Sequence, residues 1–244
     1  MAEPVSNPVG PGREAEEPTG RGSVAAILFD VDSTLISTGG ASDRAWKRAF
    51  SELQEIEVDV GEYTDKGVPD PQVGLDSFRG AIGREPSNAE MAALMAARHR
   101  HLPEEVENSP GYRVMPGVVE TLKRLSDEGR LVGLITGNTE IAAHVKLSRA
   151  NLNHFFSFGG YGSDANARVD VCRKALDRAE LVSGGRLDRE GSIAVGDTPL
   201  DVEAGHGAGV KVLCLATGEY SADALRDAGG DWVVASLSAG PLPF

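Results

Sequence analysis

The chain has 244 residues, of which 41% are hydrophobic and 25% are charged. This ordinary globular composition excludes a chain disordered throughout, a collagen and a small disulfide scaffold. The formal net charge of −13 argues against a nucleic acid as the main partner, because nucleic-acid affinity depends on basic side chains. A small anionic substrate remains compatible with this charge, since one metal ion and one cationic side chain are enough to hold it.

The N-terminal segment, residues 1–22, has almost no apolar side chains and is predicted to be a disordered tail. It lacks the positive start and apolar stretch of a secretory signal. No apolar run approaches the ~18 residues of a membrane span, so we expect no membrane partner. Cys172 and Cys214 stand alone, which favours buried, reduced thiols. Together these features predict a cytoplasmic protein.

Five short apolar runs follow the tail and are predicted to be strands. They cover residues 24–29, 131–135, 193–195, 212–215 and 232–234. Unbroken apolar runs are typical of a parallel sheet that helices cover on both faces. The helices expected between these runs begin at Pro116, at Asn138, at about Val169, at Thr198-Pro199 and at Ser221. Strands alternating with helices predict an α/β domain with a Rossmann-like parallel sheet.

Residues 39–112 interrupt this alternation, because they contain helix and turn signals but no convincing strand. Ser42 is predicted to start one helix, and Ser87 to start another that runs towards Leu102. The segment between them, residues 64–71, is rich in turn formers. We therefore expect an inserted helical domain over residues 39–112. The core domain would then comprise residues 23–38 and 113–244.

Polar residues follow three of the predicted strands at the points where the strands end. Asp30 and Asp32 follow the first strand, Thr136 closes the second, and Asp197 follows the third. The carboxyl ends of parallel strands meet at one edge of the sheet, so these side chains should lie close together. Crowded carboxylates need a cation, and Mg²⁺ prefers such oxygen ligands. One carboxylate can then attack a phosphoryl group, while another moves the proton of the leaving group.

The pattern resembles the motifs of the haloacid dehalogenase superfamily of phosphohydrolases. The matching residues are Asp30-Val31-Asp32-Ser33-Thr34, then Thr136, then a cationic residue, then Gly196-Asp197 with Asp201. The resemblance covers residues 24–235. The inserted helices lie where the cap domain is found in the phosphoglycolate phosphatase-like and β-phosphoglucomutase-like branch. The resemblance thus implies a core domain with a helical cap over its site.

Carried over to this sequence, the resemblance implies a role for each residue of the pattern. Asp30 is the nucleophile, and Asp32 is the general acid and base that also offers its backbone carbonyl to the metal. The phosphoryl group is bound by Thr136, with Gly137 and Asn138 beside it. Asp197 is a direct ligand of Mg²⁺. Asp201 supports the site from the outer shell or holds the cationic side chain.

Two positions depart from the family pattern. The residue after the second aspartate is usually glycine, and here it is Ser33. The cationic position is usually lysine, and here Arg168 stands at the expected junction of loop and helix. Arginine can neutralise the same charges with a different geometry. Lys174 and Lys146 are rivals for this role, ranked lower because both fall inside predicted helices and away from the strand ends.

The function expected from these features is that of a Mg²⁺-dependent phosphatase for a small phosphorylated metabolite. Lys66, in the turn-rich segment of the insertion, is a candidate substrate-binding residue, because its counterpart in similar proteins faces the active site. A sugar-phosphate mutase with the same motifs is the first alternative, and a catalytically silent binding protein is another. A phosphonate hydrolase would need a desolvated lysine in the cap, and nothing in the sequence marks Lys47 or Lys66 as desolvated. A dehalogenase is disfavoured because its relatives lack the second aspartate that Asp32 supplies.

Overall fold

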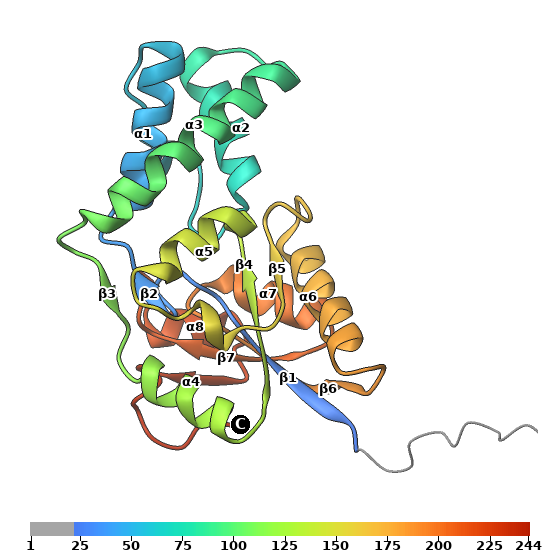
Figure 1. The fold of residues 1–244 in the computed structure, drawn as a ribbon. Coiled ribbons are helices and arrows are strands. Elements are labelled where there is room, and N and C mark those ends of the chain that lie inside the picture. The colour runs from blue at the N-terminus through green and yellow to red at the C-terminus, as the bar shows by residue number, and fades with distance from the viewer. Residues whose placement is uncertain (1–21) are drawn as a thin grey trace, which may run out of the picture.

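The computed structural model describes residues 22–244, so all but the last residue of the tail predicted over residues 1–22 lies outside the described residues. Six strands form one sheet in the order β5-β4-β1-β6-β7-β8, and all neighbouring strands are parallel (Figure 1). The strands are β1 (Val24–Phe29), β4 (Leu131–Thr136), β5 (Gly159–Tyr161), β6 (Leu187–Gly196), β7 (Lys211–Leu215) and β8 (Trp232–Val234). The predicted α/β class with a parallel sheet is confirmed.

The sheet differs from the prediction in two places. Strand β5 was not expected, because its Gly-Gly-Tyr sequence is short and carries no apolar run. Strand β6 begins at Leu187, six residues before the predicted start at Ile193. Its first half is half-buried to exposed and contains three charged residues, so only the second half has the apolar sequence of a buried strand.

Helices cover both faces of the sheet and enclose two hydrophobic layers. Side chains of β1 alternate between these layers: Ile27 and Phe29 enter one, Ala26 and Leu28 the other. The first layer is closed by α4 (Val118–Asp127) and α5 (Glu140–Ser148), followed by the short η2 (Asn153–Phe155). The second is closed by α6 (Arg168–Val182), α7 (Pro199–Gly207) and α8 (Ala222–Asp227).

The helix starts agree with the sequence signals to within about two residues. Thr198 and Ser221 begin α7 and α8 through side-chain hydrogen bonds, as predicted. Helix α5 instead begins after Thr139, whose hydroxyl accepts a hydrogen bond from the backbone N–H of Ala142. The expectation that Asn138 starts this helix is therefore wrong. The side chain of Asn138 faces the site described below.

The insertion consists of α1 (Ala41–Gln54), η1 (Val60–Glu62), α2 (Asp70–Ile82) and α3 (Asn88–Glu107). It packs around its own hydrophobic cluster, which includes Trp46, Phe50 and Phe78. A two-stranded antiparallel ribbon of β2 (Ile36–Ser37) and β3 (Arg113–Val114) joins it to the core. In Figure 1 these helices lie together above the carboxyl ends of the strands. We call α1 to α3 and their connections the cap. The exact domain bounds stay a prediction.

Helix α2 was not expected, because its first residues were interpreted as part of a turn-rich segment. The helix begins at Asp70-Pro71, and Pro71 occupies one of its first positions. Proline is well tolerated there, since the first N–H groups of a helix have no partner within the helix. The turn signals of this segment therefore mark the start of a helix.

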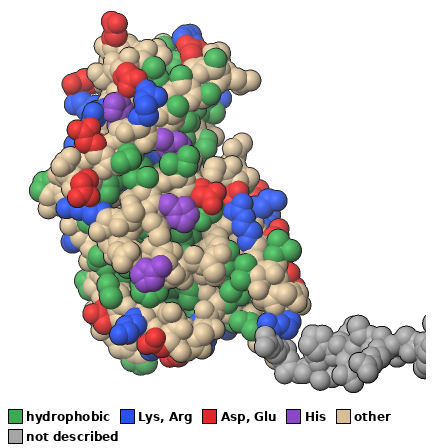
Figure 2. All heavy atoms as spheres, viewed as in Figure 1, with side chains coloured by type: hydrophobic (Ala, Val, Ile, Leu, Met, Phe, Trp, Pro, Cys, Tyr) green, Lys and Arg blue, Asp and Glu red, His purple; other side chains and the backbone are tan. Residues whose placement is uncertain are grey.

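The described part of the chain has no helix that is both long enough and apolar enough to cross a bilayer. On the face drawn in Figure 2, Lys and Arg side chains lie scattered among Asp and Glu side chains. Both cysteines are buried and unbridged, as expected.

Candidate active site

The register of the sheet brings three of the predicted site residues to one edge. Phe29 at the end of β1 is level with Leu134 of β4 and with Val195 of β6. The residues that follow these positions therefore emerge together, namely Asp30 from β1, Thr136 from β4 and Asp197 after β6. All three are buried. Strand β1 is flanked by strands that come later in the chain on both sides, which is where ligands bind in open α/β sheets.

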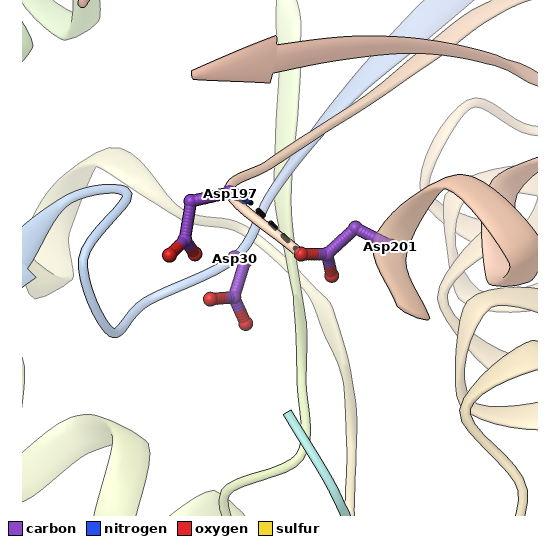
Figure 3. A group of neighbouring side chains, drawn as sticks. All are labelled: Asp30, Asp197 and Asp201. Atoms are coloured by element: carbon purple, nitrogen blue, oxygen red, sulfur yellow. Dashed lines mark hydrogen bonds between the residues drawn. The ribbon is translucent and has the colours of Figure 1, made fainter. Parts of the chain in front are cut away.

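The carboxylates of Asp30, Asp197 and Asp201 form a tight group at this edge. Each offers an oxygen atom that lies within 4.8 Å of the others. Figure 3 shows that the three side chains approach from different segments: the end of β1, the end of β6 and the first turn of α7. Such a group of oxygen ligands suits a hard divalent cation.

Arg168 supplies the positive charge within this group. Its Nη2 atom donates to an oxygen of Asp30 at 2.6 Å and to one of Asp201 at 2.5 Å. Arg168 is the first residue of α6, and its guanidinium is buried. The structure thus brings Arg168 into contact with Asp30, the residue that the family resemblance implies to be the nucleophile. The group holds three carboxylates and one guanidinium, so two negative charges remain when all three carboxylates are ionised.

The pKa values follow from this crowding. Burial, and then the charges of Asp201, Asp30 and Asp32, raise the pKa of Asp197 to about 9. Burial also raises the pKa of Asp30 to about 7, although Arg168 acts in the opposite direction. These carboxylates resist ionisation unless a further cation is present. The donor set therefore fits a divalent metal ion, which would balance the two remaining charges.

Asp201 is held differently from the other two carboxylates. One oxygen accepts from Arg168, and the other accepts from the backbone N–H groups of Asp197 and Thr198 and from the hydroxyl of Thr198. This is a reciprocal capping arrangement at the start of α7. Asp201 thus shapes the loop that carries Asp197, which is compatible with the supporting role expected for it.

The carboxylate of Asp32 lies outside the acidic group and faces Lys146 instead. Nζ of Lys146 donates to Oδ2 of Asp32 at 2.6 Å and to Oδ1 of Asn138 at 2.5 Å. Partial burial would raise the pKa of Asp32, but the charge of Lys146 and the hydrogen bonds from Lys146 and Asn138 lower it. The expectation that Lys146 lies away from the strand ends is wrong.

Lys146 is the site residue that the sequence-based reasoning ranked too low. It lies in the last turn of α5, beyond the reach of any short motif around Thr136. The available signal was its setting, since it stands alone between Val145 and Leu147 in a mainly apolar helix. A lysine side chain is rarely buried beneath such a helix unless it is paired with an acidic or polar group. Lys174, the other rival, is exposed on α6.

Thr136 and Asn138 form the part of the site that follows β4. The Nδ2 atom of Asn138 donates to Oγ1 of Thr136 at 2.8 Å and to Oδ2 of Asp32 at 2.7 Å. Asn138 therefore links the hydroxyl expected to bind a phosphoryl group with the carboxylate expected to move protons. Gly137 lies between them and is packed against the backbone of the cap at Gly67 and Val68.

The cap contacts the core directly above these residues. Its Asp70 donates a backbone N–H to the carbonyl of Gly137 at 2.7 Å and accepts the N–H of Thr139 at 2.8 Å. Buried Arg98 of α3 pairs with the same carboxylate at 3.0 Å. In addition, Arg168 donates to the carbonyl of Gly67 at 3.2 Å. The cap is thus joined to the strand-end loops by several hydrogen bonds.

Between cap and core lies a cavity of about 380 Å³. Its lining includes Asp30, Asp32, Thr136, Lys146, Arg168 and Asp197 on the core side. The cap contributes Trp46 and Lys66 among others. Lys66 is about half exposed, and its Nζ lies 3.9 Å from Asp43. The structure places Lys66 on the cavity wall, as the sequence-based prediction for this residue requires.

Comparisons with known proteins agree with this geometry. The family model described as haloacid dehalogenase-like hydrolase matches residues 27–215. Phosphoglycolate phosphatase of Vibrio cholerae is 27% identical over 218 residues, covering 86% of this chain and 92% of the relative. Pyrophosphatase PpaX of Halalkalibacterium halodurans is 25% identical over 217 residues, covering 88% of this chain and 94% of the relative.

Among solved structures, a hydrolase from Pseudomonas syringae superposes with a TM-score of 0.69 at 19% sequence identity. The match covers 88% of this chain and 95% of that chain. At this level of identity the likeness concerns the fold, and it extends over both the sheet and the cap.

Proposed function

This chain belongs to the haloacid dehalogenase-like hydrolase family, and from this membership we propose that it is a Mg²⁺-dependent phosphatase for a small phosphorylated metabolite. The observation that carries the proposal is the buried group of Asp30, Asp197 and Asp201 around Arg168, which opens into the cavity beneath the cap. Curated relatives of similar length are named as phosphatases, including the phosphoglycolate phosphatase of Vibrio cholerae.

In the proposed reaction, a carboxylate oxygen of Asp30 attacks the phosphorus atom and the bond to the leaving oxygen breaks. The protonated form of Asp32 gives its proton to that oxygen, so the leaving group departs as an alcohol. Asp32 then takes a proton from water, whose oxygen attacks the phosphorus of the aspartyl phosphate. Phosphate is released, and Asp30 is regenerated as a carboxylate.

The other residues bind and orient the phosphoryl group. The hydroxyl of Thr136 and the backbone beside Gly137 and Asn138 are available to hold phosphoryl oxygens. The guanidinium of Arg168 keeps Asp30 oriented and reduces its repulsion of the incoming phosphate.

The metal would be held by Asp30, Asp197 and the backbone carbonyl of Asp32, with Asp201 behind them. When bound, Mg²⁺ offsets the negative charge shared by the carboxylates and the phosphate.

The cap is proposed to select the leaving group. The cavity wall at Trp46, Ser42 and Lys66 lies across from the strand ends, where the rest of a substrate would extend. Closure of the cap also excludes bulk water from the site. A cavity of about 380 Å³ suits a small metabolite, since its volume is near the lower end of the range for ligand pockets, which is roughly 300 Å³.

The test is an assay with p-nitrophenyl phosphate, with and without Mg²⁺, on the native protein and on Asp30→Asn. We expect turnover that requires Mg²⁺ and disappears in the variant, because an amide cannot act as the nucleophile. Equal activity in both proteins, or no activity on any ester in a broad panel of phosphates, would contradict the proposal. A requirement for a sugar bisphosphate would favour the mutase alternative.

A further inference from the structure

Lys146 is buried against the site although the mechanism above assigns it no role. Its side chain is 2% exposed, and its Nζ contacts the side chains of Asp32 and Asn138. Burial of an ammonium group is unfavourable unless charged and polar partners compensate for the lost water. Lys146 lies in α5, and the next residue of this helix, Leu147, belongs to the hydrophobic core. The ammonium group is therefore held at a fixed place.

The contacts to Asp32 concern only one of its two carboxylate oxygens. Lys146 and the side-chain amide of Asn138 both donate to Oδ2, at 2.6 and 2.7 Å. Within residues 22–244, no donor is hydrogen-bonded to Oδ1. The side chain of Asp32 is 41% exposed and lines the cavity. Oδ2 is thus fixed by two donors, whereas Oδ1 is available to contact a group bound in the cavity.

The same two donors connect Asp32 to the expected phosphate site. Asn138 accepts from Lys146 through its Oδ1 atom and donates through Nδ2 to both Asp32 and Thr136. Lys146 thereby also fixes the orientation of the amide, because its positive charge requires the oxygen of Asn138 to face it. Asn138 therefore links the carboxylate of Asp32 to the hydroxyl of Thr136 and fixes their relative positions.

We propose that Lys146 is a positioning residue, which together with Asn138 holds Oδ2 of Asp32 so that Oδ1 is the atom that exchanges a proton with the leaving group. The inference rests on the proposed phosphatase function, since that function assigns the proton transfer to Asp32. In this step the bond between Oδ1 and its proton breaks while the leaving oxygen gains the proton. Lys146 keeps its own protons throughout.

A residue that positions the general acid affects substrates unequally. An ester whose leaving group is a weak acid needs its proton early, whereas p-nitrophenolate departs readily without one. A misplaced Asp32 should therefore slow the cleavage of phenyl phosphate much more than that of p-nitrophenyl phosphate. A purely structural lysine, or one that binds the phosphoryl group, would affect both esters alike.

The experiment compares kcat/KM for these two esters in the native protein, Lys146→Met and Lys123→Met. Lys123 is an exposed lysine of α4 and serves as the matched control. For Lys146→Met we expect kcat/KM on phenyl phosphate to fall by about 10- to 100-fold, as is typical when an orienting partner is removed. On p-nitrophenyl phosphate the fall should be several times smaller. The control should match the native protein on both esters.

The outcomes distinguish a failure of the positioning role of Lys146 from a failure of the proposed phosphatase function. If the native protein and the control show no Mg²⁺-dependent turnover of either ester, the proposed function fails. If they are active and Lys146→Met loses the same factor on both esters, or loses nothing, the positioning role is wrong. Only a selective loss on phenyl phosphate supports it.

Two further variants cover the case in which Lys146→Met does not fold. Lys146→Arg keeps the charge and a donor, so it should recover part of the activity on phenyl phosphate. Lys146→Gln keeps a donor without the charge and should recover less. Thermal unfolding of each variant identifies those that fold. If the folded Arg and Gln variants have the native ratio of kcat/KM on the two esters, the inference is overturned.

Discussion

Arg168 lies between two buried carboxylates, one of which is the proposed nucleophile and the other an anchor of α7. Because both partners are buried, loss of the guanidinium leaves two uncompensated charges. Removal of one member of a buried ion pair typically costs 3–5 kcal/mol. Arginine also supplies a second nitrogen: Nη2 contacts both carboxylates, and Nη1 donates to the carbonyl of Gly67.

We predict that Arg168→Ala lowers the free energy of unfolding by about 3 kcal/mol in the absence of metal. It should also abolish measurable phosphatase activity. Arg168→Lys should retain the fold and part of the activity, because an ammonium restores the charge without the fixed fork geometry. Urea denaturation and the p-nitrophenyl phosphate assay provide the measurements. Arg173→Ala, at an exposed position of α6, is the control. An alanine variant as stable as this control would contradict the prediction.

Single residues show both the reach and the limit of sequence-based prediction for this site. Asp30, Thr136 and Asp197 could be placed at one edge because a strand ends at each of them. Lys146 could not, since its contact with Asp32 depends on how α5 packs on the sheet. Ser33 adopts a positive φ of 60°, which explains why glycine is usual at this position in the family.

At the scale of elements, the loop after β7 forms one wall of the acidic site. An added Cβ at Gly218 would lie 1.8 Å from a carboxylate oxygen of Asp197. The backbone of Gly218 does not adopt a positive φ, so an alanine there meets no conformational strain. The side chain of Asp197 would have to rotate away instead. An alanine at Gly218 is therefore expected to disturb metal binding more than folding.

We predict that Gly218→Ala weakens Mg²⁺ binding by at least about tenfold, as is typical when the orientation of a metal ligand is disturbed. The melting temperature without metal should change little. Calorimetric titration with Mg²⁺ tests this, with Gly22→Ala as the control because Gly22 has open space around it. An affinity equal to that of the control would show that Asp197 does not need this orientation.

The elements themselves were predictable to the extent that their sequences carry local signals. Apolar runs located five strands, and hydroxyl residues located the starts of α3, α7 and α8. Helix α2 was missed because proline signals both turns and helix starts. Strand β5 was missed because its glycines are required by packing: a Cβ at Gly160 would meet the backbone of α6 at 2.1 Å.

At the scale of the whole molecule, the acidic site makes stability depend on pH and on metal together. Without a cation, the folded chain raises the pKa of Asp30 to about 7 and that of Asp197 to about 9. The unfolded chain releases these protons near pH 4, so between these limits the folded state binds more protons. The free energy of unfolding contributed by these groups therefore falls as the pH rises from about 4 to about 9.

We predict that stabilisation by Mg²⁺ grows with pH over this range, because a bound cation requires both carboxylates to be ionised. The shift in melting temperature caused by a fixed concentration of Mg²⁺ should be larger at about pH 8 than at about pH 6. Asp197→Asn has no titrating group at that position and should show a smaller shift at both pH values. A shift that is equal at both pH values, or that falls as the pH rises, would contradict the prediction.

The most direct test of the central claim is a crystal structure of the native protein grown with Mn²⁺. This ion prefers the same hard oxygen ligands as Mg²⁺, and its anomalous signal identifies its position. We predict one strong anomalous peak in direct contact with carboxylate oxygens of Asp30 and Asp197. The absence of a peak between these two side chains, or an occupied site elsewhere in the chain with this one empty, would contradict the account.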